Sequence, residues 1–125
     1  MNIFLSIVVG IVSFGAVPNN ESVNNADAIN SAIEQCSSRG GGVVTVPTGV
    51  FTTGTVYMKS GVTVRLERGA TLKGTACLDD YASLKTADDL SMYESGRGTV
   101  NYNSATDPQW SKAMIFGVGC TGAGI

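Results

Sequence analysis

The chain has 125 residues, of which 43% are hydrophobic and 14% are charged, and its formal net charge is −2. This balance predicts a packed protein and argues against a disordered one. The negative net charge gives no electrostatic basis for binding nucleic acid or an anionic membrane, so we expect neither partner. Sixteen glycines favour short strands joined by tight turns over long helices.

The chain has no histidine and three cysteines, Cys36, Cys77 and Cys120. The cysteine spacings fit no zinc motif, and the usual acid–base group at neutral pH is missing, so we expect neither a metal nor a cofactor. An odd number of cysteines leaves at least one thiol free or paired outside the chain, which keeps the redox compartment open. For Cys36 we expect burial among apolar side chains.

The N-terminal segment, residues 1–13, begins with the apolar run MNIFLSIVVGIV. Two interpretations remain open, a secretory leader and an N-terminal strand that continues into Phe14. The run lacks a basic start and a small-residue cleavage motif, and it is too short to span a bilayer.

Residues 24–39 carry the clearest helical pattern. Apolar side chains recur at i, i+3, i+4 and i+7 and therefore share one face, namely Ile29, Ala32, Ile33 and Cys36. Asn24 or Asn25 is placed to cap the N-terminus, and Gly40 marks the end. Because one face is apolar, this helix is expected to cover another part of the fold.

A repeat follows within residues 43–74. The pattern Val44-x-Val46-x-x-Gly49-Val50-x-x-x-Gly54 recurs twenty positions later as Val64-x-Leu66-x-x-Gly69-Ala70-x-x-x-Gly74. Periods of this size indicate a solenoid, in which each coil buries its apolar face on the next. Within the second copy, Val62, Val64 and Leu66 alternate with polar residues, which predicts a strand with these three side chains inward. The end of a solenoid needs a cap, and the preceding helix is placed to supply it.

The pattern is lost in residues 75–111, a polar stretch that we interpret as a loop excursion between coils. A strand of a further coil is expected within residues 113–125, and the lack of a C-terminal cap leads us to expect that the natural protein continues. Aromatic faces in the excursion are candidates for stacking on sugar rings, and these substrate-binding candidates are Tyr93, Tyr102 and Trp110.

Several ordered stretches resemble one known family. They are Phe14-Gly15-Ala16-Val17, the helix ending in Gly40-Gly41-Gly42, Val46-Pro47-x-Gly49-x-Phe51-x-Thr53-Gly54, Lys59-Ser60-x-Val62-x-Val64-x-Leu66-Glu67-x-Gly69-Ala70-Thr71-Leu72-x-Gly74, and Asp80-Tyr81. Together, over roughly residues 11–81, they resemble the N-terminal region of glycoside hydrolase family 28, the polygalacturonases and related pectin-degrading enzymes. The resemblance implies an all-β fold, a right-handed parallel β-helix, of which residues 14–125 would be the N-terminal part with its capping helix.

The resemblance also implies an enzyme that hydrolyses galacturonate-rich pectic polysaccharide with inversion, in a secreted or periplasmic setting. That reaction uses carboxyl groups on opposite sides of the sugar. The family's Asn-Thr-Asp, Gly-His-Gly and Arg-Ile-Lys segments are absent here. Asp80-Tyr81 coincides with a structural Asp-Tyr of the family and not with its catalytic pair. The acidic pairs Asp79-Asp80 and Asp88-Asp89 are therefore interpreted as solvated loop acids. We therefore assign no catalytic residue and expect this chain alone to be inactive.

Two alternatives remain open at this point. One is a non-catalytic β-solenoid that binds carbohydrate or serves as a structural segment of an adhesin or tail fibre. The other is a pectate lyase, which would need calcium-binding carboxylates and an arginine base, neither identifiable here. In all cases the open end of a short solenoid favours self-association of the chain.

Overall fold

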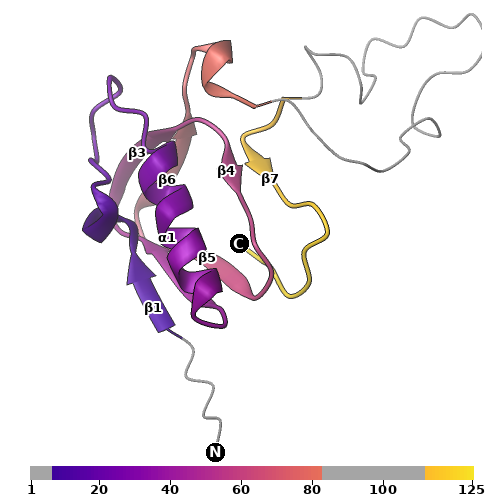
Figure 1. The fold of residues 1–125 in the computed structure, drawn as a ribbon. Helices are drawn as coiled ribbons and strands as arrows, with labels where there is room; N and C mark the ends of the chain where they lie inside the picture. Colours follow the sequence, from indigo (N-terminus) through magenta and orange to yellow (C-terminus); the bar gives the residue numbers. More distant parts are fainter. Residues whose placement is uncertain (1–6, 83–111) are drawn as a thin grey trace, which may run out of the picture.

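The computed structural model describes residues 7–82 and 112–125 (Figure 1). It is built mainly of short strands around one α-helix. In chain order the elements are β1 (Ile7–Gly10), the 3-10 helix η1 (Ile11–Phe14), α1 (Ala26–Ser38), β2 (Gly42–Val46), β3 (Gly49–Thr53), β4 (Val56–Tyr57), β5 (Val62–Leu66), β6 (Ala70–Gly74), the 3-10 helix η2 (Leu78–Asp80) and β7 (Ile115–Phe116).

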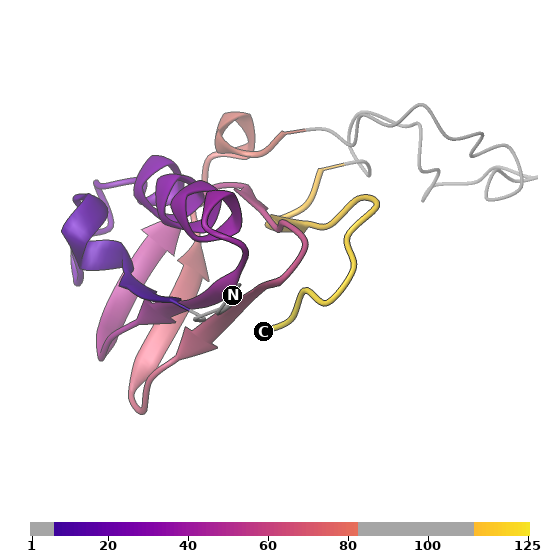
Figure 2. The same ribbon diagram turned by 60° about the horizontal axis from the view of Figure 1, so that its bottom comes forward.

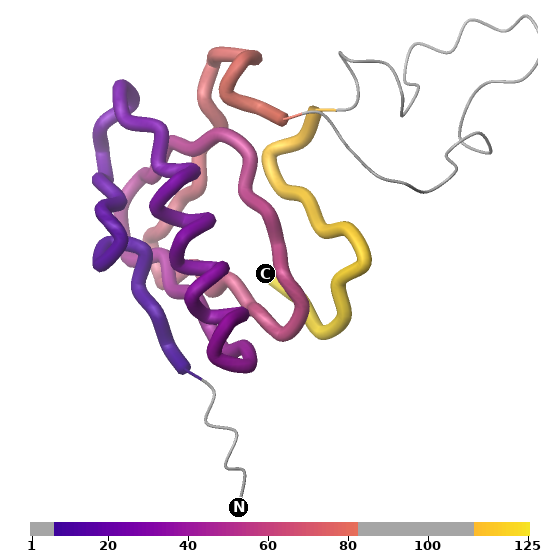
Figure 3. The backbone as a smooth tube through the Cα atoms, in the orientation of Figure 1, coloured from indigo at the N-terminus to yellow at the C-terminus, as the bar shows by residue number. Residues whose placement is uncertain are grey.

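The strands form three small sheets in which every pairing is parallel. Their strand orders are β1-β2-β5, β3-β6 and β4-β7. Each sheet therefore takes one strand from a first layer, β2 to β4, and one from a second layer, β5 to β7. Figure 3 shows the backbone of the two layers running side by side. Parallel neighbours cannot be joined by a tight hairpin, so the chain passes through the other sheets before it returns.

The predicted repeat is confirmed in the first strand of each layer. Val44 pairs with Val64 and Val46 with Leu66, a spacing of twenty residues. The side chains of Val44, Val46, Val62 and Val64 are buried together in the core. Leu66 differs from the prediction: it is 37% exposed, because it lies in the second layer, which the described residues cover less completely.

The predicted spacing is wrong by one residue in the next strand. Gly49 pairs with Ala70 and Phe51 with Leu72, so the offset is 21 residues and not 20. The second layer has one residue more in the turn before β6, where the Gly49 N–H donates to the Gly69 carbonyl. A slip of one residue would move every side chain to the opposite face of the sheet. The shift instead places Leu72 beneath the buried Phe51.

The predicted helix forms, with bounds within two residues of those expected, and its apolar face is buried as predicted. Ile29, Ala32, Ile33 and Cys36 are all fully buried in the core. The helix packs against η1 and the strands β1, β2 and β4, as Figure 2 shows from a second direction. The apolar face of α1 therefore packs against the first layer of strands.

Asparagine side chains cover the outer backbone edge of the first layer, the edge that faces away from the second. On β3, the carbonyl of Thr52 accepts from Asn25 Nδ2 at 3.0 Å, and directly after the strand the N–H of Gly54 donates to Asn24 Oδ1 at 2.8 Å. Asn30 of α1 does the same for β4: its Nδ2 donates to the Thr55 carbonyl and its Oδ1 accepts from the Tyr57 N–H. Because an unpaired strand edge invites association, these contacts seal this end of the stack.

Asn25 occupies the N-cap position of α1, as predicted, but its side chain does not cap the helix. Its Oδ1 accepts from the Val17 N–H, and its Nδ2 donates to the carbonyls of Val17 and Thr52. The helix start is served instead by Asn24, whose Oδ1 accepts from the Ala26 N–H at 3.0 Å. The two neighbouring asparagines therefore tie the loop before α1 to β3.

β1 covers the remaining outer edge, that of β2, with four residue pairs from Ile7↔Gly42 to Gly10↔Thr45. Ile11, directly after β1, is fully buried in the core. Within the described ranges, 7–82 and 112–125, no helix is both long and apolar enough to cross a membrane.

Candidate functional site

The β4-β7 sheet and the residues that follow its strands carry two exposed apolar side chains, Tyr57 and Val118, and the half-buried Phe116. Along β4 the side chains alternate: Val56 is buried, Tyr57 is 46% exposed, Met58 packs against the core and Lys59 is exposed. This alternation is the two-residue period of a strand with one face in solvent. Tyr57 therefore points away from the core, and Lys59, beyond the end of β4, is exposed.

β7 presents the matching side chains. Tyr57 pairs with Phe116, and their rings stack with centroids 6.1 Å apart and an interplanar angle of 27°. The ladder continues past β4, because the Met58 N–H donates to the Phe116 carbonyl at 2.6 Å. Val118, two residues beyond Phe116, is 50% exposed. We call Tyr57, Lys59, Phe116 and Val118 the β4-β7 face; β4 and β7 are labelled side by side in Figure 1.

The two neighbouring acidic residues Asp79 and Asp80 belong to a turn at the end of the second layer. Asp79 and Asp80 lie in η2, where the Asp80 carbonyl accepts from the Thr55 N–H. The following Tyr81 donates its hydroxyl to the Thr75 carbonyl at 2.7 Å, which folds this turn back on the end of β6. Among the described residues no group of His, Cys, Asp and Glu is arranged to hold a metal ion. The geometry of Asp80-Tyr81 is that of a structural turn.

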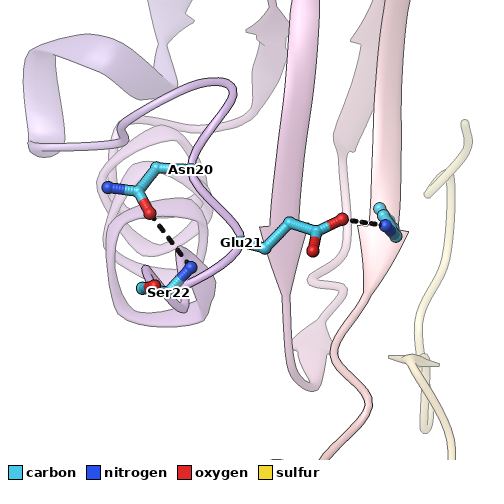
Figure 4. A network of polar contacts seen from close by, with 4 residues as sticks. Asn20, Glu21 and Ser22 are labelled. Carbon is cyan, nitrogen blue, oxygen red and sulfur yellow. Dashed lines mark hydrogen bonds and ion pairs between the residues drawn. The ribbon is translucent and has the colours of Figure 1, made fainter.

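Two basic residues of the second layer, Arg65 and Lys73, are engaged with carboxylates. Arg65 Nη2 lies 3.1 Å from Glu67 Oε1, and Lys73 is paired with Glu21 (Figure 4). The hydrogen bond from Lys73 and its charge hold the pKa of Glu21 below the ordinary value of 4.5. Glu21 belongs to the loop before α1, whose Asn20 Oδ1 accepts from the Ser22 N–H. This pair therefore links the loop to β6.

All three thiols are free, with Cys36 buried, Cys77 exposed and Cys120 partly buried. Burial raises the pKa of the Cys36 thiol, which keeps it protonated and unreactive. The Sγ of Cys120 lies 3.3 Å from the Met58 carbonyl, beneath the β4-β7 face.

The three aromatic residues predicted to bind substrate, Tyr93, Tyr102 and Trp110, lie outside the described residues, as do Asp88 and Asp89. Sequence reasoning missed Tyr57 and Phe116 as a pair. β4 and β7 have two residues each and are separated by 59 positions (57 to 116), so no local period connects them.

Comparison with known proteins gives one consistent result. The chain matches no protein-family model. Among curated proteins it is 39% identical, over 74 residues, to the exo-poly-α-D-galacturonosidase of Dickeya chrysanthemi. That match covers 59% of this chain but spans only 12% of the relative's length.

Solved structures show the same likeness in fold. The family 28 exopolygalacturonase of Yersinia enterocolitica matches 93% of this chain and 17% of its own, with a TM-score of 0.65 and 25% identity. The hyperthermoactive exopolygalacturonase of Thermotoga maritima matches 63% of this chain and 18% of its own, at 0.55 and 27%. A protein from Parabacteroides merdae matches 94% of this chain and 42% of its own, with a TM-score of 0.66 and 22% identity, and this likeness shows the fold alone. In sequence and in fold, the chain resembles the polygalacturonases of glycoside hydrolase family 28.

Proposed function

We propose that these residues form the capped first coils of a right-handed parallel β-helix that serves as the scaffold of a polygalacturonase-like glycoside hydrolase. The observation that carries the proposal is the parallel stacking of two layers at offsets of 20 and 21 residues. A solenoid requires such a period, because each coil buries its apolar face on the next. The likeness to family 28 exopolygalacturonases supports both the fold and the reaction class.

The substrate we propose for the whole protein is a galacturonate-rich pectic polysaccharide, cleaved with inversion. The chain spans 12% of its curated relative, and its sequence has neither a histidine nor the family's catalytic segments. We therefore propose that these 125 residues contribute the stable end of the scaffold and do not hydrolyse the polymer by themselves. Because a pectic polysaccharide is a large polymer, we also propose that the whole protein is secreted or periplasmic.

A non-catalytic carbohydrate-binding solenoid is the second candidate. The stacked pair of the exposed Tyr57 and the half-buried Phe116 favours it, because aromatic faces can hold a sugar without chemistry at the same place. The two candidates differ in what they predict for a longer chain, since only the first predicts turnover.

The test compares this chain with the longest product of its reading frame, incubated side by side with polygalacturonate. We expect reducing ends from the longer chain only, and inverted anomers by NMR spectroscopy. Binding of polygalacturonate without turnover by the longer chain would support the non-catalytic candidate. Unsaturated products would indicate a lyase, and turnover by the 125-residue chain would contradict the assigned role.

A further inference from the structure

We propose that the β4-β7 face is a binding site for uronic acid units, with Tyr57 and Phe116 as the stacking platform and Lys59 as the partner of the sugar carboxylate. The inference rests on the proposed pectic substrate and adds a location and a chemistry to it. It differs from the sites expected from sequence, since none of these residues belongs to the excursion of residues 75–111.

The two rings are held by the backbone and not by chance contact. Their strands are paired through Val56↔Ile115 and Tyr57↔Phe116, and the inward neighbours Val56 and Ile115 pack in the core. Neighbouring strands lie about 4.8 Å apart, so aromatic side chains at paired positions form a continuous apolar strip across the sheet. A sugar ring that lies on this strip replaces water on its C–H face, as in other contacts of amphipathic rings with aromatic residues.

Lys59 contributes a positive charge to this face. Lys59 is exposed and follows Tyr57 by two residues, just beyond the end of β4. The two ion pairs formed within the described residues use Arg65 and Lys73, not Lys59. An ammonium group that follows an aromatic residue along the chain, and that pairs with no carboxylate of residues 7–82 and 112–125, suits a sugar that carries its own carboxylate. A neutral sugar has no carboxylate with which the Lys59 ammonium group could pair.

The experiment titrates trigalacturonate and, separately, a neutral galactose trimer into the 125-residue chain by isothermal calorimetry. Wild-type chain is expected to bind the acidic trimer more tightly, with a preference that shrinks as salt rises, because exposed charges are screened. Tyr57→Ala should weaken binding of both trimers by about three- to tenfold. Lys59→Gln should weaken binding of the acidic trimer alone, by up to about fivefold.

Matched controls lie elsewhere on the surface. Leu78→Ala removes an exposed apolar side chain from η2, and Lys73→Gln removes a cation from β6; both should bind as wild type. Tyr57→Phe should keep the affinity because the ring is retained, and circular dichroism checks that every variant is folded. Equal affinity of wild type and Tyr57→Ala, or equal loss from Lys73→Gln and Lys59→Gln, would overturn the site. Polygalacturonate turnover by the longer chain tests the proposed function separately, so either can fail alone.

Discussion

The two ends of the stack are finished in different ways. The first layer has its outer backbone edge covered along all three strands: β1 pairs with β2, and asparagine side chains occupy the outer edges of β3 and β4. In the second layer, among the described residues, β5 has only a bridge from Thr63 to Gly124 beyond its pairing with β2, and β6 pairs on one side alone. Burial differs in the same direction between β3 and β6, where Phe51 is fully buried and Leu72 only partly, although Val62 and Val64 of β5 are buried as well. The first layer is therefore where the stability of this chain is concentrated.

The largest difference between the layers should appear at the paired positions Phe51 and Leu72. Phe51 is fully buried in the first layer, whereas its partner Leu72 is only partly buried in the second. Phe51→Ala is expected to lower the free energy of unfolding by about 3–5 kcal/mol, from lost burial and a cavity. Leu72→Ala should lower it by about 2 kcal/mol or less. Urea denaturation measures both, and equal losses would show that the two layers are equally packed.

The second largest effect on stability is expected from the asparagine side chains that cover the edge of the first layer. Asn25 is 2% exposed and bonds to both Val17 and Thr52. Asn25→Ala leaves the Thr52 carbonyl with one partner fewer, and we expect a loss of about 1–3 kcal/mol. Asn25→Asp keeps the acceptor but turns an oxygen toward two carbonyls, so it should be at least as destabilising. The exposed Asn20, which makes one local bond, is the control: Asn20→Ala should stay within about 0.5 kcal/mol of wild type. If Asn20→Ala lowered the free energy of unfolding as much as Asn25→Ala, the buried hydrogen bonds of Asn25 would not be the cause of its effect.

The smallest effect concerns the ion pair between Glu21 and Lys73, which joins the loop before α1 to the second layer. Because Lys73 lowers the pKa of Glu21, the pair stabilises the fold above the ordinary value of 4.5 and loses this effect as the pH falls through the lowered pKa. Glu21→Gln should therefore reduce thermal stability slightly at neutral pH and low salt, with no difference from wild type in strong acid. Glu67→Gln, which removes a carboxylate paired only two residues away, is the matched control. A difference that persists in acid would assign the effect to packing.

Much of the framework followed from local periods. The sequence predicted the helix and the pairing of Val44 with Val64. Both depend on local patterns of apolar residues, with a period of 3.6 residues in a helix and 2 in a strand, which can be seen in the sequence itself. The helix residues predicted to face inward are buried, namely Ile29, Ala32, Ile33 and Cys36. The resemblance to family 28 was likewise present in ordered motifs and agrees with the comparisons.

Only the tertiary structure decided the rest, because it depends on residues far apart in the chain. The extra residue before β6 moved Leu72, and not Thr71, beneath Phe51. The sequence predicted Asn25 as a helix cap, but its side-chain amide donates to the carbonyls of Val17 in the loop and Thr52 in β3. The sequence alone could not show that these carbonyls lie beside Asn25. The stacking of Tyr57 on Phe116 also depends on residues far apart in the chain. The two rings meet because the backbones of two short strands pair across 59 positions, and no local sequence pattern predicts that pairing.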